Sequence, residues 1–322
     1  MIEFLILLAS LAGIVFGADF LVAGSVTIAR RFKVSDFVIG AAIVGVGTSM
    51  PELVVSFIGA LSGNSDVAIG NVVGSNIFNI LGILGITAIF FPVAIDRTNM
   101  KFELPVCIGV SVLLTLFAFN FFNGNPPVIS RFDGLVLLAV FSVFMWYSFY
   151  RGRTSAADSN VSDTEEEKGK SIWIAVAKVA GGLALLITSC DIFVDNAVLI
   201  AKSFGVGDAF ISLTLIACGT SLPELAASIA SAMKKNTQMA LGNIVGSNIF
   251  NITLILGVSS QVMPLTSGGI TMVDYLVMIA AALILYFFGL KGRIGRLGGV
   301  FLFLCFVGYT CWLLFTQNAA PA

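Results

Sequence analysis

The chain has 322 residues, of which 58% are hydrophobic and only 11% charged, and its formal net charge is −1. Soluble globular domains carry about 25% charged residues, so this composition excludes a cytosolic enzyme, a disordered protein and a nucleic-acid-binding protein. The mean hydropathy of +1.02 indicates a membrane protein instead. Its apolar runs are long and continuous, which favours helices over the alternating strands of a membrane barrel.

Ten apolar segments reach the length of about 18 residues that a membrane-spanning helix needs. We therefore predict an all-α polytopic membrane protein with ten transmembrane helices. In chain order, the predicted spans are residues 2–29, 37–61, 67–93, 103–122, 132–150, 172–201, 209–233, 238–263, 272–290 and 297–316.

Basic residues are distributed very unequally between the connections of these spans. One set of connections carries fourteen Lys and Arg residues, and the opposite set carries only Arg131 and Lys202. Because Lys and Arg accumulate in cytoplasmic connections, both termini are predicted to face outward from a plasma (inner) membrane. The lipid bilayer is then the surrounding solvent, and no obligatory protein partner is expected.

The only long hydrophilic segment, residues 151–170, is predicted to be cytoplasmic. Its three consecutive glutamates raise the possibility of a calcium sensor, but the segment lacks the ligand spacing of an EF-hand loop. We interpret it as a hydrophilic linker between two halves, residues 1–150 and 171–322.

The two halves contain an internal repeat. GTSMPEL at 47–53 recurs as GTSLPEL at 219–225, and GNVVGSNIFNI at 70–80 recurs as GNIVGSNIFNI at 242–252. Both pairs share an offset of 172 residues, and about half of the positions from 19 to 85 match their partners. The offset covers five predicted crossings, so the second five-helix repeat enters the bilayer inverted. Inverted repeats around a site at the midplane are typical of secondary transporters with alternating access.

One glutamate of each repeat, Glu52 or Glu224, falls inside a predicted span. A carboxylate at mid-bilayer costs at least about 2.5–3.5 kcal/mol, so the pair needs compensation by cations. The alternative is a protonated or hydrogen-bonded structural pair. Pro51 and Pro223 lack an N–H group and are predicted to unwind their helices, freeing the carbonyls of Gly47 and Gly219.

Hydroxyl and amide side chains surround these glutamates in both motifs. Together with freed carbonyls they form an all-oxygen set, which suits Na⁺ and Ca²⁺ better than soft metals. The alternative for the second motif is helix packing through its Gly-x-x-x-Gly pattern. The candidate oxygen donors are Thr48, Ser49, Ser75 and Asn79 in the first repeat, and Thr220, Ser221, Ser247 and Asn251 in the second.

Several other polar residues lie in or near the predicted spans. Asp19, Asp191 and Asp195 serve either an ion path or a helix contact, whereas Asp36 and Asp208 are expected to cap helices. The remaining motif asparagines are expected at most to brace neighbouring backbone; these are Asn71, Asn76, Asn243 and Asn248.

These paired motifs resemble those of the cation/calcium exchanger superfamily, and most closely those of prokaryotic sodium/calcium exchangers. The resemblance implies that Glu52 and Glu224 are the central acidic ligands. It implies further ligands in the hydroxyl and amide groups above and in carbonyls near Gly45 and Ala217. For Ca²⁺ it implies a centre of Glu52, Glu224, Thr48 and Thr220. Asparagine at both 79 and 251 is unlike potassium-dependent members.

The favoured function is antiport of Ca²⁺ against Na⁺, with no resident cofactor. A Ca²⁺/H⁺ exchanger using the same glutamates is the nearest alternative, and a cation channel is a second. A membrane enzyme is disfavoured because the chain contains no histidine to act as a base.

Overall fold

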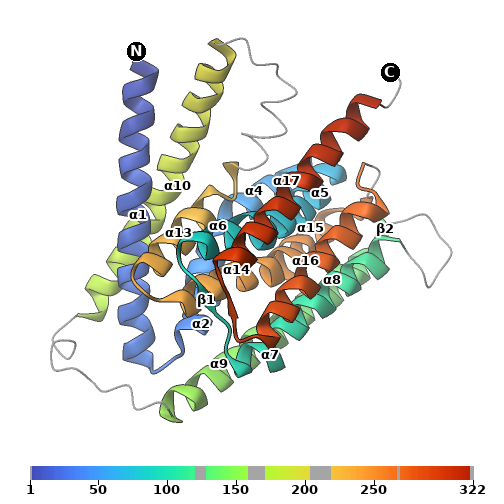
Figure 1. The fold of residues 1–322 in the computed structure, drawn as a ribbon. Coiled ribbons are helices and arrows are strands. Elements are labelled where there is room, and N and C mark those ends of the chain that lie inside the picture. Colours follow the sequence, from blue (N-terminus) through green and yellow to red (C-terminus); the bar gives the residue numbers. More distant parts are fainter. Residues whose placement is uncertain (1, 120–127, 159–170, 204–218, 267–268, 320–322) are drawn as a thin grey trace.

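The computed structural model describes residues 2–119, 128–158, 171–203, 219–266 and 269–319 (Figure 1). Before residue 159 the elements are α1 (Ile2–Phe32), α2 (Asp36–Ile39), the π-helix η1 (Gly40–Gly45), α3 (Val46–Thr48), α4 (Met50–Leu61), α5 (Ser65–Ile77), the π-helix η2 (Phe78–Ile83), α6 (Leu84–Phe90), β1 (Val93–Ala94), α7 (Arg97–Lys101), α8 (Glu103–Ala118), β2 (Val128–Ile129) and α9 (Arg131–Asp158).

After residue 170 a matching series follows. It comprises α10 (Ile172–Ser203), α13 (Leu222–Met233), α14 (Thr237–Phe250), the π-helix η5 (Asn251–Ile255), α15 (Leu256–Val262), β3 (Leu265–Thr266), α16 (Met272–Leu290), β4 (Arg293–Ile294) and α17 (Arg296–Ala319). The predicted helical membrane protein is confirmed by this succession of long apolar helices.

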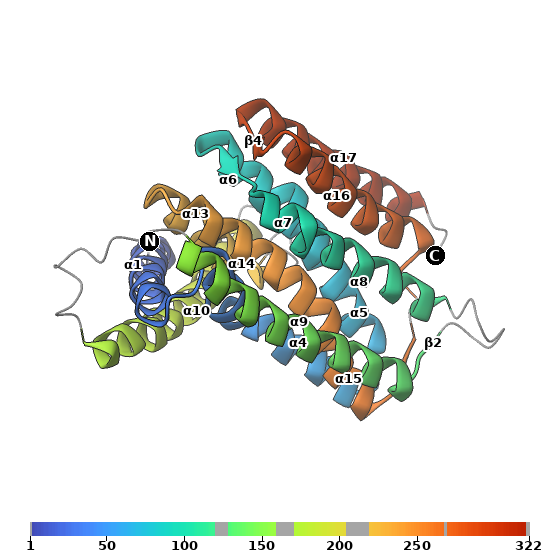
Figure 2. The same cartoon turned by 90° about the horizontal axis from the view of Figure 1, so that it is seen from below.

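The two longest helices, α1 and α10, lie side by side at one edge of the molecule, away from α16 and α17 (Figure 2). Glycine permits this close contact: a Cβ atom on Gly17 would lie 2.7 Å from the backbone nitrogen of Leu186, and one on Gly182 would lie 2.6 Å from that of Leu21. Only 28% of the most apolar stretch of α1 and 17% of that of α10 are buried. These helices therefore contact each other more than they contact the core.

The centre of the molecule is built from the repeated second motif. The continuous helices Ser65–Phe90 and Thr237–Val262 have 83% and 89% of their most apolar stretches buried, compared with at most 39% in the other six unbroken spanning helices of the described residues. Side chains such as Val72, Ile77, Ile244 and Ile249 are fully enclosed there. Burial of these two helices places the polar residues of their motifs in the interior.

Two short antiparallel ribbons connect the halves. β1 pairs with β4, and β2 pairs with β3, so each ribbon takes one strand from each half. β1 and β3 lie at equivalent positions of the repeat, since Val93 and Leu265 differ by the repeat offset. This exchange of equivalent strands is the pattern that a two-fold relation between the halves produces.

Among the described residues, eight helices are long and apolar enough to span a membrane, or nine if the bent pair Asp36–Thr48 and Met50–Leu61 counts as one span. Of the predicted span 209–233, only Leu222–Met233 appears as a helix, and residues 209–218 lie outside the described part. The start of α1 and the end of α17 lie at the same end of the molecule (Figure 1). Asp36 is the first residue of α2 rather than its cap, because Ser35 occupies the N-cap and accepts from the Val38 N–H. Asp208 lies outside the described residues.

Candidate cation-binding site

A helix break precedes each candidate glutamate. The chain bends by 48° between α3 and α4, and Ser49 is the single residue between them, with φ −83° and ψ 10°. Ser221 has nearly the same backbone conformation, φ −93° and ψ 8°, before α13. The predicted unwinding is thus confined to Ser49 in the first repeat, and in the second it includes Thr220 and Ser221. Glu52 and Glu224 both fall in the first turn of the following helix, where the helix dipole favours a carboxylate.

The glutamates are completely enclosed and are bound by the opposite half of the chain. Each side chain is only 1% exposed. The Ser221 hydroxyl donates to Oε1 of Glu52 at 2.9 Å, and the Ser49 hydroxyl donates to Oε1 of Glu224 at 2.8 Å. Because each bond crosses between equivalent positions of the two motifs, the two candidate centres form one shared site.

Ser75 and Ser247 extend this cluster. The Ser221 oxygen lies 3.2 Å from that of Ser75, and the Ser49 oxygen lies 3.0 Å from that of Ser247. All four serines are buried. The structure therefore brings together the predicted hydroxyl donors of both motifs beside the glutamates.

Asn79 and Asn251 lie in the π-helical segments η2 and η5, which occupy equivalent places in the two halves. The Asn79 amide donates to the side-chain oxygen of Asn248 at 2.9 Å, and the Asn251 amide donates to that of Asn76 at 3.1 Å. Asn76 and Asn248 in turn donate to each other's backbone carbonyls at 3.2 and 3.1 Å. Such π segments are common at functional sites because they redirect side chains from the regular helical spacing.

This network leaves a set of buried oxygens without a hydrogen-bond partner among the described residues. Leaving a buried acceptor unsatisfied costs about 1–3 kcal/mol, and more for a charged group, so a cluster of such atoms at one place favours a bound ligand. At the site, the atoms are Oε2 of Glu52, Oε2 of Glu224, Oδ1 of Asn79, Oδ1 of Asn251 and Oγ1 of Thr220. All five belong to residues that the sequence predicts as ligands.

Two other predicted ligands, the Thr48 hydroxyl and the Gly45 carbonyl, already have protein groups as hydrogen-bond partners. The Thr48 hydroxyl lies within 3.4 Å of the Gly45 carbonyl and 3.3 Å of the Asn243 side-chain oxygen. The Gly45 carbonyl accepts from the Ser49 N–H at 3.0 Å and the Ser247 hydroxyl at 3.3 Å. Protein donors thus occupy the Gly45 carbonyl in this structure, and Ala217 lies outside the described residues.

Asn71 and Asn243 form a layer of hydrogen bonds that supports the two glutamates. The sequence predicts at most that they brace neighbouring backbone. The Asn71 amide donates to the Glu52 carbonyl at 3.1 Å and to the Ser56 hydroxyl at 3.0 Å. The Asn243 amide makes the same pair of bonds with the Glu224 carbonyl and with Ser228, at 3.1 and 2.8 Å. Ser56 and Ser228 are the same residue type at equivalent positions of the repeat, and this match in the sequence could have identified the layer.

Asp19 does not reach the site. Its carboxylate lies 2.7 Å from the Lys234 ammonium group and is about half exposed, so it makes a helix contact. The described residues contain no group of three or more His, Cys, Asp or Glu side chains that could hold a metal ion. Two carboxylates with neutral oxygens are therefore the full acidic complement of the site in the described part of the chain.

Comparison with known proteins places this geometry in context. A family model described as sodium/calcium exchanger protein matches residues 2–150 and 174–315. Antiporter CaxA of Alkalimonas amylolytica is 38% identical over 96% of this chain and 98% of its own length. Sodium/calcium exchanger MaX1 of Methanosarcina acetivorans is 32% identical over 98% and 99%.

A solved structure gives the same result in three dimensions. The sodium-calcium exchanger NCX_Mj, soaked with zero Na⁺ and Ca²⁺, superposes with a TM-score of 0.83 and 32% sequence identity, covering 97% of this chain and 98% of that one. The match extends through both halves, as does the family model. This multi-pass membrane protein therefore belongs to the sodium/calcium exchanger family.

Proposed function

We propose that this protein, as a Ca²⁺ antiporter, exchanges Ca²⁺ for Na⁺ at the site shared by Glu52 and Glu224. The observation that carries the proposal is the set of buried, unpartnered oxygens contributed by both halves. Two ionised glutamates balance the charge of one Ca²⁺. Thr48 and Thr220 are the neutral oxygens proposed to complete the Ca²⁺ centre.

Na⁺ ions are proposed to occupy the same oxygens, spread over neighbouring positions. The serine and asparagine oxygens supply these positions beside the carboxylates: those of Ser49, Ser75, Asn79, Ser221, Ser247 and Asn251. Because both ions need the two carboxylates, simultaneous occupancy is unfavourable. An empty site leaves two buried charges without compensation, which disfavours the return of the transporter without an ion.

Alternating access is supported by the reciprocal contacts between the halves. We propose ten spans in two inverted five-helix repeats, residues 1–150 and 171–322, joined by a cytoplasmic linker at 151–170. Both termini then face outward from the plasma membrane. The protein acts as a transporter with no resident cofactor, and the ions are its substrates.

Flux into sealed vesicles tests the choice of counter-ion. Vesicles loaded with Na⁺ should accumulate Ca²⁺ when diluted into sodium-free medium, with a measurable change in membrane potential. A pH gradient without Na⁺ should drive little uptake, and K⁺ should not be required. Uptake driven by the pH gradient alone would identify a Ca²⁺/H⁺ exchanger, and flux without any counter-ion would identify a channel.

A further inference from the structure

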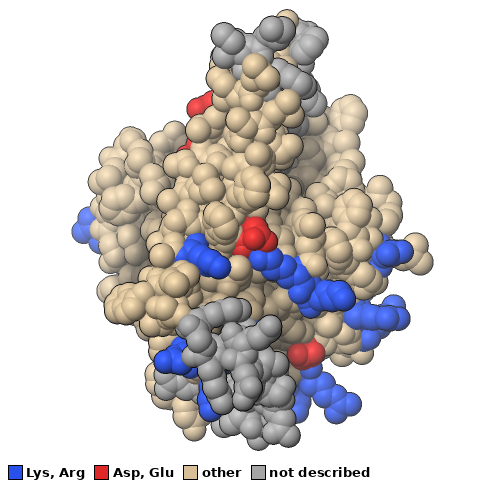
Figure 3. Space-filling model, turned by 90° about the vertical axis from the view of Figure 1, so that its left-hand side faces the viewer, with Lys and Arg blue, Asp and Glu red and all other residues tan. Residues whose placement is uncertain are grey.

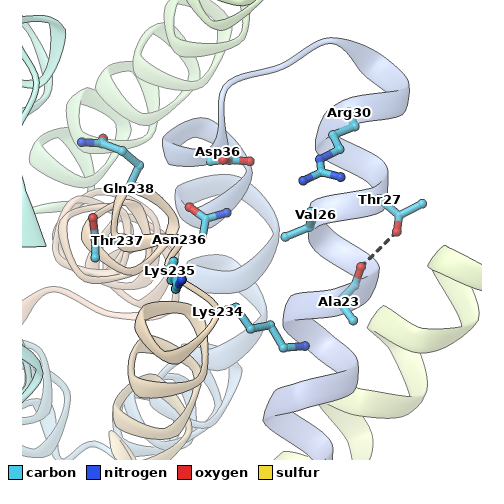
Figure 4. A pocket seen from close by; sticks show the side chains of 10 residues that line it. All are labelled: Ala23, Val26, Thr27, Arg30, Asp36, Lys234, Lys235, Asn236, Thr237 and Gln238. Atoms are coloured by element: carbon cyan, nitrogen blue, oxygen red, sulfur yellow. Dashed lines mark hydrogen bonds between the residues drawn. The ribbon is translucent and has the colours of Figure 1, made fainter. Parts of the chain in front are cut away.

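A cavity lies apart from the glutamate site, between α1 and the turn from α13 to α14. It has a volume of about 530 Å³ (Figure 4). Its lining combines charged, polar and apolar side chains, which is unusual next to a membrane-spanning helix. The lining residues are Ala23, Val26, Thr27, Arg30, Asp36, Lys234, Lys235, Asn236, Thr237 and Gln238.

The charges of this cavity favour an anion. Three cationic side chains and one carboxylate, Asp36, line it. Arg30 extends from α1 toward the turn, and Lys234 extends from the turn toward α1 (Figure 4). Lys234 also pairs with Asp19, at 2.7 Å. With Asp19 included, the cations still outnumber the carboxylates, so the cavity keeps a positive balance.

Of the three cations that line the cavity, Lys235 is the least constrained by the fold. It is exposed, its φ angle of 60° lies in the left-handed region, and its backbone N–H closes the end of α13 on the Ala232 carbonyl at 2.9 Å. The neighbouring polar groups are already engaged: Asn236 accepts from the Met239 N–H, and Gln238 donates to the Ala94 carbonyl. The turn therefore holds Lys235 at the rim of the cavity.

The apolar side of the cavity continues onto the surface of α1. Phe16, Phe20, Ala23, Thr27 and Arg30 follow the spacing of one helix face, so a stripe runs from two exposed phenylalanines through the cavity to a guanidinium group. Phe16 is 59% exposed and Phe20 is 43% exposed. A molecule with an anionic head group and an apolar chain fits a surface on which an apolar stripe leads to cationic side chains.

The position of the cavity in the molecule agrees with such an occupant. Lys and Arg side chains gather over the lower half of the face that Figure 3 shows, and few lie above it. Arg30, Lys234 and Lys235 belong to the connections that are rich in Lys and Arg. Basic pockets between helices on that side of a membrane are suited to phosphate head groups of anionic lipids.

We propose that this cavity binds an anionic phospholipid, with its phosphate beside Arg30 and Lys235 and an acyl chain along the α1 stripe. The site is independent of ion exchange at Glu52 and Glu224. It joins α1 to the turn that follows α13, so a bound lipid adds to the Lys234–Asp19 contact between them.

Binding is measured on the purified full-length protein in a neutral detergent. Short-chain phosphatidylglycerol is added in steps, and the thermal unfolding midpoint is followed as a function of its concentration. The midpoint should rise and saturate with phosphatidylglycerol, but not with phosphatidylcholine of the same chain length. Inorganic phosphate should have no comparable effect, because it lacks the chain that contacts α1.

Two variants test the location. Lys235→Gln should raise the half-saturating lipid concentration about five-fold, the equivalent of one near-surface charge. Ala23→Leu fills the cavity without a change in charge and should weaken binding similarly. Lys291→Gln removes an exposed charge from another basic connection and should leave the concentration unchanged.

Three results would overturn the proposal. An equal loss in Lys291→Gln would show diffuse attraction to basic groups. Saturation by inorganic phosphate alone would show a site for a free anion, and equal stabilisation by phosphatidylcholine would show no role for charge. A variant whose midpoint without lipid equals that of the unmodified protein is correctly folded, so its binding data decide the location.

Discussion

At the scale of single residues, each glutamate of the site divides its two oxygens between different partners. Oε1 accepts from a serine of the opposite half, whereas Oε2 has no partner among the described residues. The serine bond fixes the orientation of the carboxylate, and the second oxygen stays available to an ion. For the proposed binding of cations, the negative charge of the side chain should matter more than its size.

Glu52→Gln and Glu224→Gln test this directly. Glutamine keeps the volume but removes the charge and places an NH₂ group where an acceptor stood. We expect Na⁺-driven Ca²⁺ uptake into vesicles to fall by about 100-fold or more, since loss of a mere outer partner of a metal ligand already costs 10–100-fold.

Glu103→Gln is the matched control. Glu103 is also a buried glutamate with an unpartnered Oε2, but it lies in the first turn of α8, outside the site. This variant should retain most of the uptake. Equal losses in all three variants would mean that the site glutamates serve the fold rather than ion binding.

Asn248 orients two neighbours at once, and its removal gives a second prediction. Its side-chain oxygen accepts from Asn79, and its amide donates to the Asn76 carbonyl. Asn248→Ala should leave the Asn79 side chain free to rotate. We expect the half-saturating Ca²⁺ concentration to rise about 10–100-fold, while the maximal rate changes less.

Asn99→Ala controls for the general cost of removing a buried asparagine. Asn99 belongs to the capping box of α7, away from the site. Its replacement should lower thermal stability and leave the half-saturating Ca²⁺ concentration as it was. A loss of maximal rate alone in Asn248→Ala would contradict an orienting role.

At the scale of elements, the helix breaks were predictable, whereas the π segments were not. Proline removes a backbone donor, so Pro51 and Pro223 predict a break within a few residues. Both prolines lie at the second position of the new helix, where no N–H partner is needed, so the break is short: Ser49 alone before α4, and Thr220 with Ser221 before α13. A π-helix has no comparable residue preference, so η2 and η5 could not be predicted from the sequence.

Close packing of α14 on α2 gives a prediction at this scale. A Cβ atom on Gly242 would collide with the backbone carbonyl of Phe37, which cannot move without α2. Gly242→Ala should therefore lower the free energy of unfolding by about 1–3 kcal/mol, seen as a lower thermal midpoint in detergent.

Gly308→Ala is the control for the change from glycine to alanine in a membrane helix. A Cβ atom on Gly308 of α17 would meet no described atom within 4 Å. Its midpoint should stay the same or rise, because alanine favours the helix by about 1 kcal/mol. Equal destabilisation by both changes would contradict the packing argument at Gly242.

At the scale of the whole molecule, the repeat offset predicts which residues meet. Hydrogen bonds between Asn76 and Asn248 join residues 172 positions apart, in both directions. The repeat motif thus predicts the composition of the site. It does not predict which atoms remain unpartnered, because that depends on how Ser49, Ser221, Asn76 and Asn248 orient their neighbours. The Lys234–Asp19 contact also has no repeat counterpart, since position 62 is serine.

The number and direction of the spans give the last prediction. The start of α1 and the end of α17 lie at the same end of the molecule (Figure 1), so the number of crossings should be even. The described residues contain eight spanning helices, or nine with the bent pair. An even total then requires the predicted span 209–233, of which only Leu222–Met233 is described. Ten crossings, with fourteen basic residues on one side, predict that both termini lie outside the cell.

Fusions of reporter proteins in a bacterial host test this arrangement. Alkaline phosphatase folds to an active form only outside the cytoplasm, and green fluorescent protein becomes fluorescent inside it. Phosphatase joined after residue 322 should be active, and fluorescent protein inserted in the 151–170 linker should fluoresce. If fluorescence appears instead at the C-terminus while the linker fusion also fluoresces, an even number of spans follows the linker. The second half would then lack one crossing, and the inverted relation between the repeats could not hold.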